Sequence, residues 1–138
     1  MTPVQMAEIH QAAFVHERGW QADEFTQLLE QPFTDALTTE GGFAITRTLA
    51  GESELLILAV APTHQRRGIA GRLMMEWTTK IQATAETAFL EVAADNQAAI
   101  ALYIKHGFAR TGLRKAYYKR TDAPAADAML MSRALTQG

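Results

Sequence analysis

The feature that most constrains this chain is the short turn Gln65–Gly71, which joins an apolar run to an amphipathic segment. The run Leu55–Ala61 (LLILAVA) is apolar throughout, and the segment RLMMEW at 72–77 has the spacing of a helix with one buried face. A buried strand that passes directly into a helix directs backbone N–H groups and the positive helix end at one position. Gly68 and Gly71 carry no Cβ that would keep a phosphate away. The turn therefore predicts an α/β fold with an anion site at a strand–helix junction.

A plainer interpretation of the same turn is a solvated, basic start of a helix. Arg66 and Arg67 would lie at the helix end where positive charge is unfavourable, beside glycines that weaken the helix. A segment that goes against several helix preferences at once often has a function that requires those residues. We therefore favour a phosphate or pyrophosphate ligand. The turn has neither the Gly-x-x-x-x-Gly-Lys-Ser/Thr pattern of nucleoside-triphosphate loops nor the Gly-x-Gly of the dinucleotide fingerprint.

Length, charge and cysteine content exclude several classes of function. The 138 residues suit one domain, which we expect over residues 1–138. A net charge of −2 gives no positive field that would attract nucleic acid or an anionic membrane. The absence of cysteine excludes disulfides, thiolate metal sites and a cysteine acyl-enzyme. With no span-length apolar stretch and no signal-peptide pattern, we expect a cytoplasmic protein.

Apolar periodicity predicts two helices before the first strand, one from Thr2 towards Gly19 and one over 23–29. Thr2, Pro3 and Gln5 match a capping box at the start of the first helix. Two further helices are expected at 68–84 and 96–105. Five strands are expected, at residues 42–48, 54–61, 88–93, 108–113 and 128–132. This order predicts a mixed sheet with helices on both faces, with a ligand where neighbouring strand ends separate.

A second group of candidate residues lies in the strand Phe89–Ala93 and the segment after it. Alternation places Glu91 in the middle of an otherwise apolar strand. Such a carboxylate is either hydrated at an open strand end, paired, or functional as a proton acceptor. Asn96 is a good N-cap for the next helix. Tyr103 would lie on the buried face of that helix, where tyrosine is more often a core residue than a catalytic one.

The two regions together resemble the GCN5-related N-acetyltransferase family. The sequence QRRGIA at 65–70 is similar to the acetyl-CoA motif of that family, Arg/Gln-x-x-Gly-x-Gly/Ala. The segments LEV at 90–92, AAIALY at 98–103, RKAYY at 114–118 and DAMLM at 127–131 are similar to its bacterial ribosomal-protein-alanine subfamily. The resemblance covers residues 43–131. It implies a single-domain fold with a mixed, mostly antiparallel sheet flanked by helices.

The resemblance also implies a role for individual residues. Glu91 would be the general base that takes a proton from the acceptor amine, directly or through a water, and Tyr103 the general acid for the CoA thiolate. Tyr117 and Tyr118 would line the acceptor side. Acetyl-CoA would be held by a strand edge, the pyrophosphate turn and one further side chain: Leu58, Ala59, Val60, Arg66, Arg67, Gly68, Ile69, Ala70, Gly71 and Asn96. The amine would attack the thioester directly, which agrees with the missing cysteine.

Three features depart from the family pattern. The chain opens with a helix where the family has a first strand, so that strand is expected to be absent. Ala93 stands where the subfamily has an arginine, and Ala126 stands where it has an acidic residue. The two substitutions bear on the acceptor and leave the cofactor motif intact.

The favoured function is transfer of an acetyl group from acetyl-CoA to a primary amine, foremost the N-terminal α-amine of a protein. The alternatives are a lysine or small-molecule amine as acceptor, a non-catalytic CoA-binding module, and a simple anion-binding domain. The presence of both Glu91 and Tyr103 argues against the module. No metal is expected, because His10, His16 and His64 are scattered. We expect a monomer or a weak homodimer.

Overall fold

The computed structural model describes residues 1–14, 18–120 and 123–135. In this part of the chain the first element is a helix, with no strand before it, and no helix is long and apolar enough to cross a membrane. The elements follow in the order α1 (Pro3–Ala13), α2 (Ala22–Glu30), β1 (Thr34–Thr39), β2 (Gly42–Leu49), β3 (Glu52–Val60), η1 (Pro62–His64), α3 (Ile69–Ile81), β4 (Thr87–Ala93), α4 (Gln97–Lys105), β5 (Ala109–Tyr118) and β6 (Ala126–Ala134).

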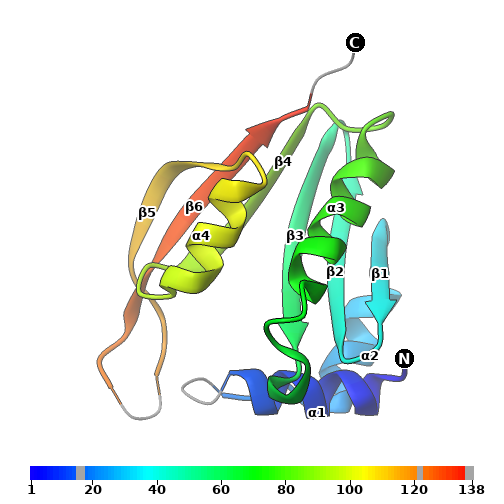
Figure 1. The fold of residues 1–138 in the computed structure, drawn as a ribbon, viewed down its shortest axis with the longest axis vertical. Helices are drawn as coiled ribbons and strands as arrows, with labels where there is room; N and C mark the ends of the chain where they lie inside the picture. Colours follow the sequence, from blue (N-terminus) through cyan, green and yellow to red (C-terminus); the bar gives the residue numbers. More distant parts are fainter. Residues whose placement is uncertain (15–17, 121–122, 136–138) are drawn as a thin grey trace.

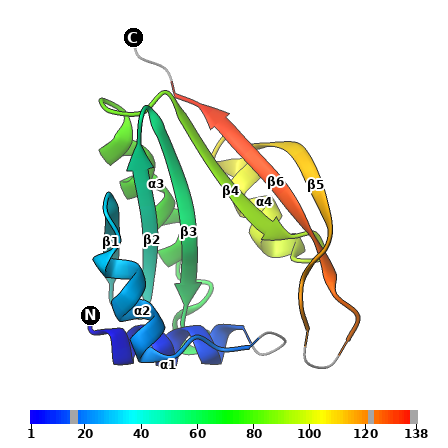
Figure 2. The ribbon, with the colours of Figure 1, turned by 180° about the vertical axis from the view of Figure 1, so that it is seen from behind.

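The strands form one sheet in the order β1-β2-β3-β4-β6-β5. β3 and β4 pair in parallel, and the other neighbouring strands are antiparallel. Helices α3 and α4 cover one face (Figure 1), while α2 lies on the opposite face and α1 crosses the end of the sheet where β3 ends (Figure 2). The predicted class, a mixed and mostly antiparallel sheet flanked by helices, is confirmed.

Strand β1 was not predicted from the sequence. Its residues, TDALTT, are mostly polar and partly exposed, so their periodicity gives little signal. The strand forms because β2 pairs with it along its whole length, from Thr34↔Arg47 to Thr39↔Gly42. Gly41, with φ of 78°, makes the turn between them. Tertiary pairing thus supplies what local preference does not.

Helix α3 is anchored to the sheet by a buried polar contact. Trp77 is 1% exposed, and its indole Nε1 donates a hydrogen bond of 2.8 Å to the Ser53 hydroxyl of β3. The ring of Phe108 stacks on Trp77 at 5.7 Å between centroids. Leu73 and Met74 are also buried on this face of the helix. This packing holds the first turn of α3 in a fixed position beside the end of β3.

Helices α1 and α2 cover a second core on the other face of the sheet. Met6 and Phe25 pack there against Phe43 and Ile45 of β2. The predicted capping box is confirmed, since Thr2 accepts a hydrogen bond from the Gln5 backbone and the Gln5 side chain accepts one from the Thr2 backbone. Helix α1 ends at Ala13, however, well before Gly19.

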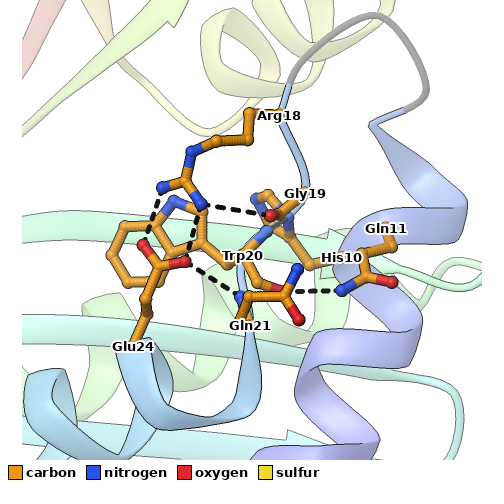
Figure 3. Close-up of polar contacts among 7 residues, drawn as sticks. All are labelled: His10, Gln11, Arg18, Gly19, Trp20, Gln21 and Glu24. Carbon is orange, nitrogen blue, oxygen red and sulfur yellow. Dashed lines mark hydrogen bonds and ion pairs between the residues drawn. The ribbon is translucent and has the colours of Figure 1, made fainter.

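The sequence did not predict that His10 is buried between α1 and α2. The side chain is 6% exposed, and its ring lies 4.7 Å from that of Phe14. Its Nδ1 accepts a hydrogen bond of 3.2 Å from the backbone N–H of Trp20. Beside it, two hydrogen bonds of 2.7 Å from Arg18 lower the pKa of Glu24 to about 2 (Figure 3). These contacts fix the entry into α2.

Burial lowers the pKa of His10, so the folded protein binds a proton there less readily than the unfolded chain. The free energy of unfolding should therefore decrease as pH falls below about 6.5, the ordinary histidine pKa. His10→Asn keeps an acceptor near the position of Nδ1 and does not titrate. We expect its melting temperature to fall less steeply than that of the wild type between pH 7 and 5. Parallel curves in thermal unfolding would contradict this interpretation.

Strands β3 and β4 remain paired over only part of their length. Their parallel register runs from Glu52↔Thr87 to Leu55↔Leu90, and beyond it the two strands diverge into a V (Figure 1). A bulge at the same level shifts the β2–β3 register, so that Leu56 has no partner on β2. The sheet is thus opened in its middle, where neighbouring strand ends separate as the sequence predicted.

Candidate active site

One wall of the opening is the edge of β3 that faces β4. Leu58, Ala59 and Val60 lie there, past the last residue pair that β3 forms with β4. Ala59 is buried against α1 and α2, while Leu58 and Val60 pack towards α3 and α4. An unpaired strand edge offers a row of backbone N–H and C=O groups to an extended ligand. The edge is thus suited to the role in holding acetyl-CoA that the resemblance implies for Leu58, Ala59 and Val60.

The turn Gln65–Gly68 connects this edge to α3. The Gln65 side-chain amide donates a hydrogen bond of 3.1 Å to the Val60 carbonyl and so ties the turn to the strand. Arg66 and Gly68 both adopt positive φ, of 65° and 76°. Gly68 is the N-cap of α3 and supplies no side-chain cap, so the first N–H groups of the helix remain available to an anion.

The left-handed φ of Gly68 favours glycine at this position. A Cβ added there would meet no protein atom within 4 Å, so the protein itself leaves the space beside Gly68 open. That a Cβ would keep a phosphate away remains a prediction. Gly71 lies inside α3, where a Cβ would come 3.6 Å from His106 Nε2. The backbone from Arg66 to Gly71, including Arg67, Ile69 and Ala70, therefore forms an open, uncapped helix start, which fits a CoA pyrophosphate.

Asn96 follows β4 at the other wall of the opening. Its side-chain oxygen accepts a hydrogen bond of 3.2 Å from the Ala99 backbone N–H, which confirms the N-cap prediction. Gly107, with φ of 88°, ends the same helix as expected. A contact between Asn96 and the cofactor remains a prediction.

Glu91 is the first residue of β4 beyond the part of the strand that pairs with β3, and it remains paired with Leu130 of β6. Its side chain is 18% exposed, and its Oε1 lies 3.2 Å from Nη2 of Arg114 on β5. Of the interpretations left open by the sequence, the structure thus shows a paired carboxylate. The guanidinium of Arg114 also lies over the ring of Tyr117, 5.4 Å from its centroid.

An irregularity in β5 brings these groups together. The β5–β6 register shifts between Arg114 and Tyr118, and Ala116 has a φ of 49°. The Ala116 N–H donates a hydrogen bond of 2.7 Å to Asp127 Oδ1, which stabilises this bulge. Arg114 and Tyr117 consequently share one face. Sequence reasoning did not select Arg114, although it stands in the RKAYY segment.

Tyr103 lies on the buried face of α4, as its position in the sequence predicted. It is 7% exposed and packs edge-on against Phe108. Burial, followed by the nearby phenol of Tyr118, raises the pKa of the Tyr103 hydroxyl. The hydroxyl is therefore protonated at neutral pH, as a proton donor must be.

A metal site finds no support in the described residues, among which no group of three His, Asp or Glu side chains converges. His16 lies outside the described residues.

Comparison with known proteins agrees with this geometry. A family model described as FR47-like protein matches residues 43–118, which include the turn, Glu91 and Tyr103. The N-alpha-acetyltransferase RimI of Mycobacterium tuberculosis is 34% identical over 128 residues, covering 86% of this chain and 80% of that protein. The chain belongs to the FR47-like group of GCN5-related N-acetyltransferases. Acetyl-CoA is the acetyl donor typical of this family, and it is bound in the crystal structure of a GNAT family acetyltransferase from Elizabethkingia anophelis.

Two further comparisons show a similarity over nearly the full length of both chains. The [ribosomal protein bS18]-alanine N-acetyltransferase of Escherichia coli is 32% identical over 131 residues, covering 91% of this chain and 88% of that protein. The crystal structure of the ribosomal-protein-S18-alanine N-acetyltransferase from Escherichia coli superposes with a TM-score of 0.84 at 32% identity. The superposition covers 96% of this chain and 86% of the Escherichia coli chain. The predicted family, fold and enzyme class are confirmed.

Proposed function

We propose that the acetyltransferase acts on the N-terminal α-amine of a protein, with an N-terminal alanine of a ribosomal protein as the model acceptor. The observation that carries the proposal is the position of Glu91 beside Arg114 and Tyr117, where β3 and β4 separate. The names of the Escherichia coli relatives support this acceptor class. A ribosomal acceptor implies that the enzyme acts in the cytoplasm. Residues 1–138 would act as one domain.

The two reactants would approach from opposite faces of the sheet. Glu91 faces away from α3 and α4, because its strand neighbours Leu90 and Val92 pack against that core. The turn at Gly68 opens at the start of α3, on the other face. When bound, acetyl-CoA would supply an activated thioester at the gap between the strands. Tyr117 and Tyr118 would line the acceptor side, in agreement with the exposure of Tyr117.

The residues of this chain would then move two protons. An ammonium group has no free electron pair, so the acceptor must lose a proton before it attacks. Glu91 is the proposed base for that proton, directly or through a water. Tyr103 is the proposed donor to the departing CoA sulfur, and its burial keeps that proton in place. No nucleophilic residue is needed, since the amine attacks the thioester itself.

Tyr103→Phe should lower kcat by a factor of about three to ten. The loss is limited because a thiol, with an ordinary pKa of about 8.5, leaves readily as the thiolate. The loss should be smaller than that caused by removing the base. Initial rates with a saturating alanine-initiated peptide would measure it, with thermal unfolding to verify that the core is intact. An unchanged kcat would contradict the role of Tyr103 as the acid.

A further inference from the structure

Four charged side chains lie across the sheet face that carries Glu91, with two carboxylates on the inner strands β3 and β4 and an arginine on either side of them. Arg47 Nη2 on β2 is 3.5 Å from Glu54 Oε1 on β3, and Arg114 Nη2 on β5 is 3.2 Å from Glu91 Oε1 on β4. Glu54 stands opposite Phe89 in the parallel register, and Glu91 follows two residues later on the same face. Of the two carboxylates on β3, Glu52 and Glu54, Glu54 therefore lies nearer to Glu91, the proposed base.

Glu54 interacts with both members of the Glu91–Arg114 pair. Its side chain is 25% exposed, and burial raises its pKa. Arg47 opposes that shift, Glu91 adds to it and Arg114 opposes it. Arg114 therefore acts electrostatically on two carboxylates, Glu54 and Glu91, while it contacts only Glu91.

We propose that Glu54 is a positioning residue that receives Arg114 when the acceptor ammonium replaces Arg114 at Glu91. The inference rests on the proposed function, because it needs a cationic acceptor at Glu91. An ammonium beside Glu91 would otherwise meet the guanidinium of Arg114 at close range, and like charges at that separation repel. A second carboxylate nearby relieves that repulsion.

The contacts of both partners suit such an exchange. The Arg114 side chain is 53% exposed, so the protein surrounds only part of its long stem. Glu54 is held by Arg47 through a contact of 3.5 Å, which is long for a charge-assisted hydrogen bond. A carboxylate has two oxygens and accepts from two guanidinium groups at once. Glu54 can therefore keep Arg47 and still receive Arg114.

Glu54→Gln tests the exchange, with Glu52→Gln as the matched control. Glu52 lies on the same face of β3, and both residues line a hollow of about 380 Å³ on that face. We expect Glu54→Gln to raise KM for an alanine-initiated peptide by about fivefold, the size of one partly exposed ion pair. The Kd of acetyl-CoA should stay unchanged, and Glu52→Gln should behave as wild type. Equal KM values for the two variants would overturn the proposal.

A double-mutant cycle with Arg114→Gln separates exchange from a general charge effect. Once Arg114 is absent, nothing needs to move to Glu54, so adding Glu54→Gln should change KM no further. A full additional increase would overturn the exchange. Glu54→Asp provides a check in case Glu54→Gln is destabilised, because it retains the charge. It should have a KM close to that of the wild type. A KM as high as that of Glu54→Gln would count against the exchange. If the wild type transfers acetyl only to other amines, the proposed acceptor fails, and the same cycle is measured with the amine it accepts.

Discussion

Glu91→Gln should lower kcat for acetylation of an alanine-initiated peptide by about 10²–10⁴-fold near neutral pH. Glutamine retains the size and polarity of the side chain but cannot take a proton from the acceptor. The Kd of acetyl-CoA should remain within about twofold of the wild type, because the turn at Gly68 lies on the other face of the sheet. Release of CoA thiol would report the rate, and calorimetry would report the Kd.

The pH dependence of the same variant provides its control. An N-terminal α-amine has an ordinary pKa of about 7.7–8.0, so the free amine becomes abundant without a base as the pH rises. The rate of Glu91→Gln should therefore approach that of the wild type towards pH 9. Equal rates for the two proteins at neutral pH would exclude Glu91 as the base.

Gly68→Val should weaken acetyl-CoA binding by about tenfold or more. The residue has a φ of 76°, which costs a residue with a Cβ roughly 1–2 kcal/mol. Because valine has open space around it, the chain is expected to relieve that strain by changing φ. Such a change would turn the first N–H groups of α3 away from the pyrophosphate. Calorimetric titration with acetyl-CoA would measure the loss.

Gly51→Val is the matched control for that variant. Gly51 has a φ of 82°, and a Cβ there also meets no atom within 4 Å, but it lies in the turn between β2 and β3. It should lose comparable stability and retain the wild-type Kd for acetyl-CoA. If both variants bind equally well, the turn at Gly68 does not hold the cofactor.

The regular elements and the cofactor turn were predictable because their signals are local. The apolar run before Gln65 and the helical spacing after Gly71 locate β3 and α3 to within three residues at each end. β1 was missed because its residues gain their order from β2, at the far side of a turn. His10 was missed for a similar reason, since its burial depends on contacts with Trp20 and Phe25.

The acceptor side of the site was only partly predictable. The sequence selects Glu91 through the cost of a carboxylate in an apolar strand. It does not show that Arg114 pairs with Glu91, because the two residues meet across β6 and through an irregular register in β5. The same holds for Glu54, whose relation to Glu91 follows from the parallel pairing of β3 with β4.

The most direct test of the account is to locate the acetyl group on a peptide with two kinds of amine. A peptide that begins with alanine and carries an internal lysine would be incubated with acetyl-CoA and the full chain, then fragmented by mass spectrometry. The account predicts one added acetyl group, on the N-terminal α-amine, and no modification of the lysine. Acetylation of the lysine alone, or of neither amine, would contradict it.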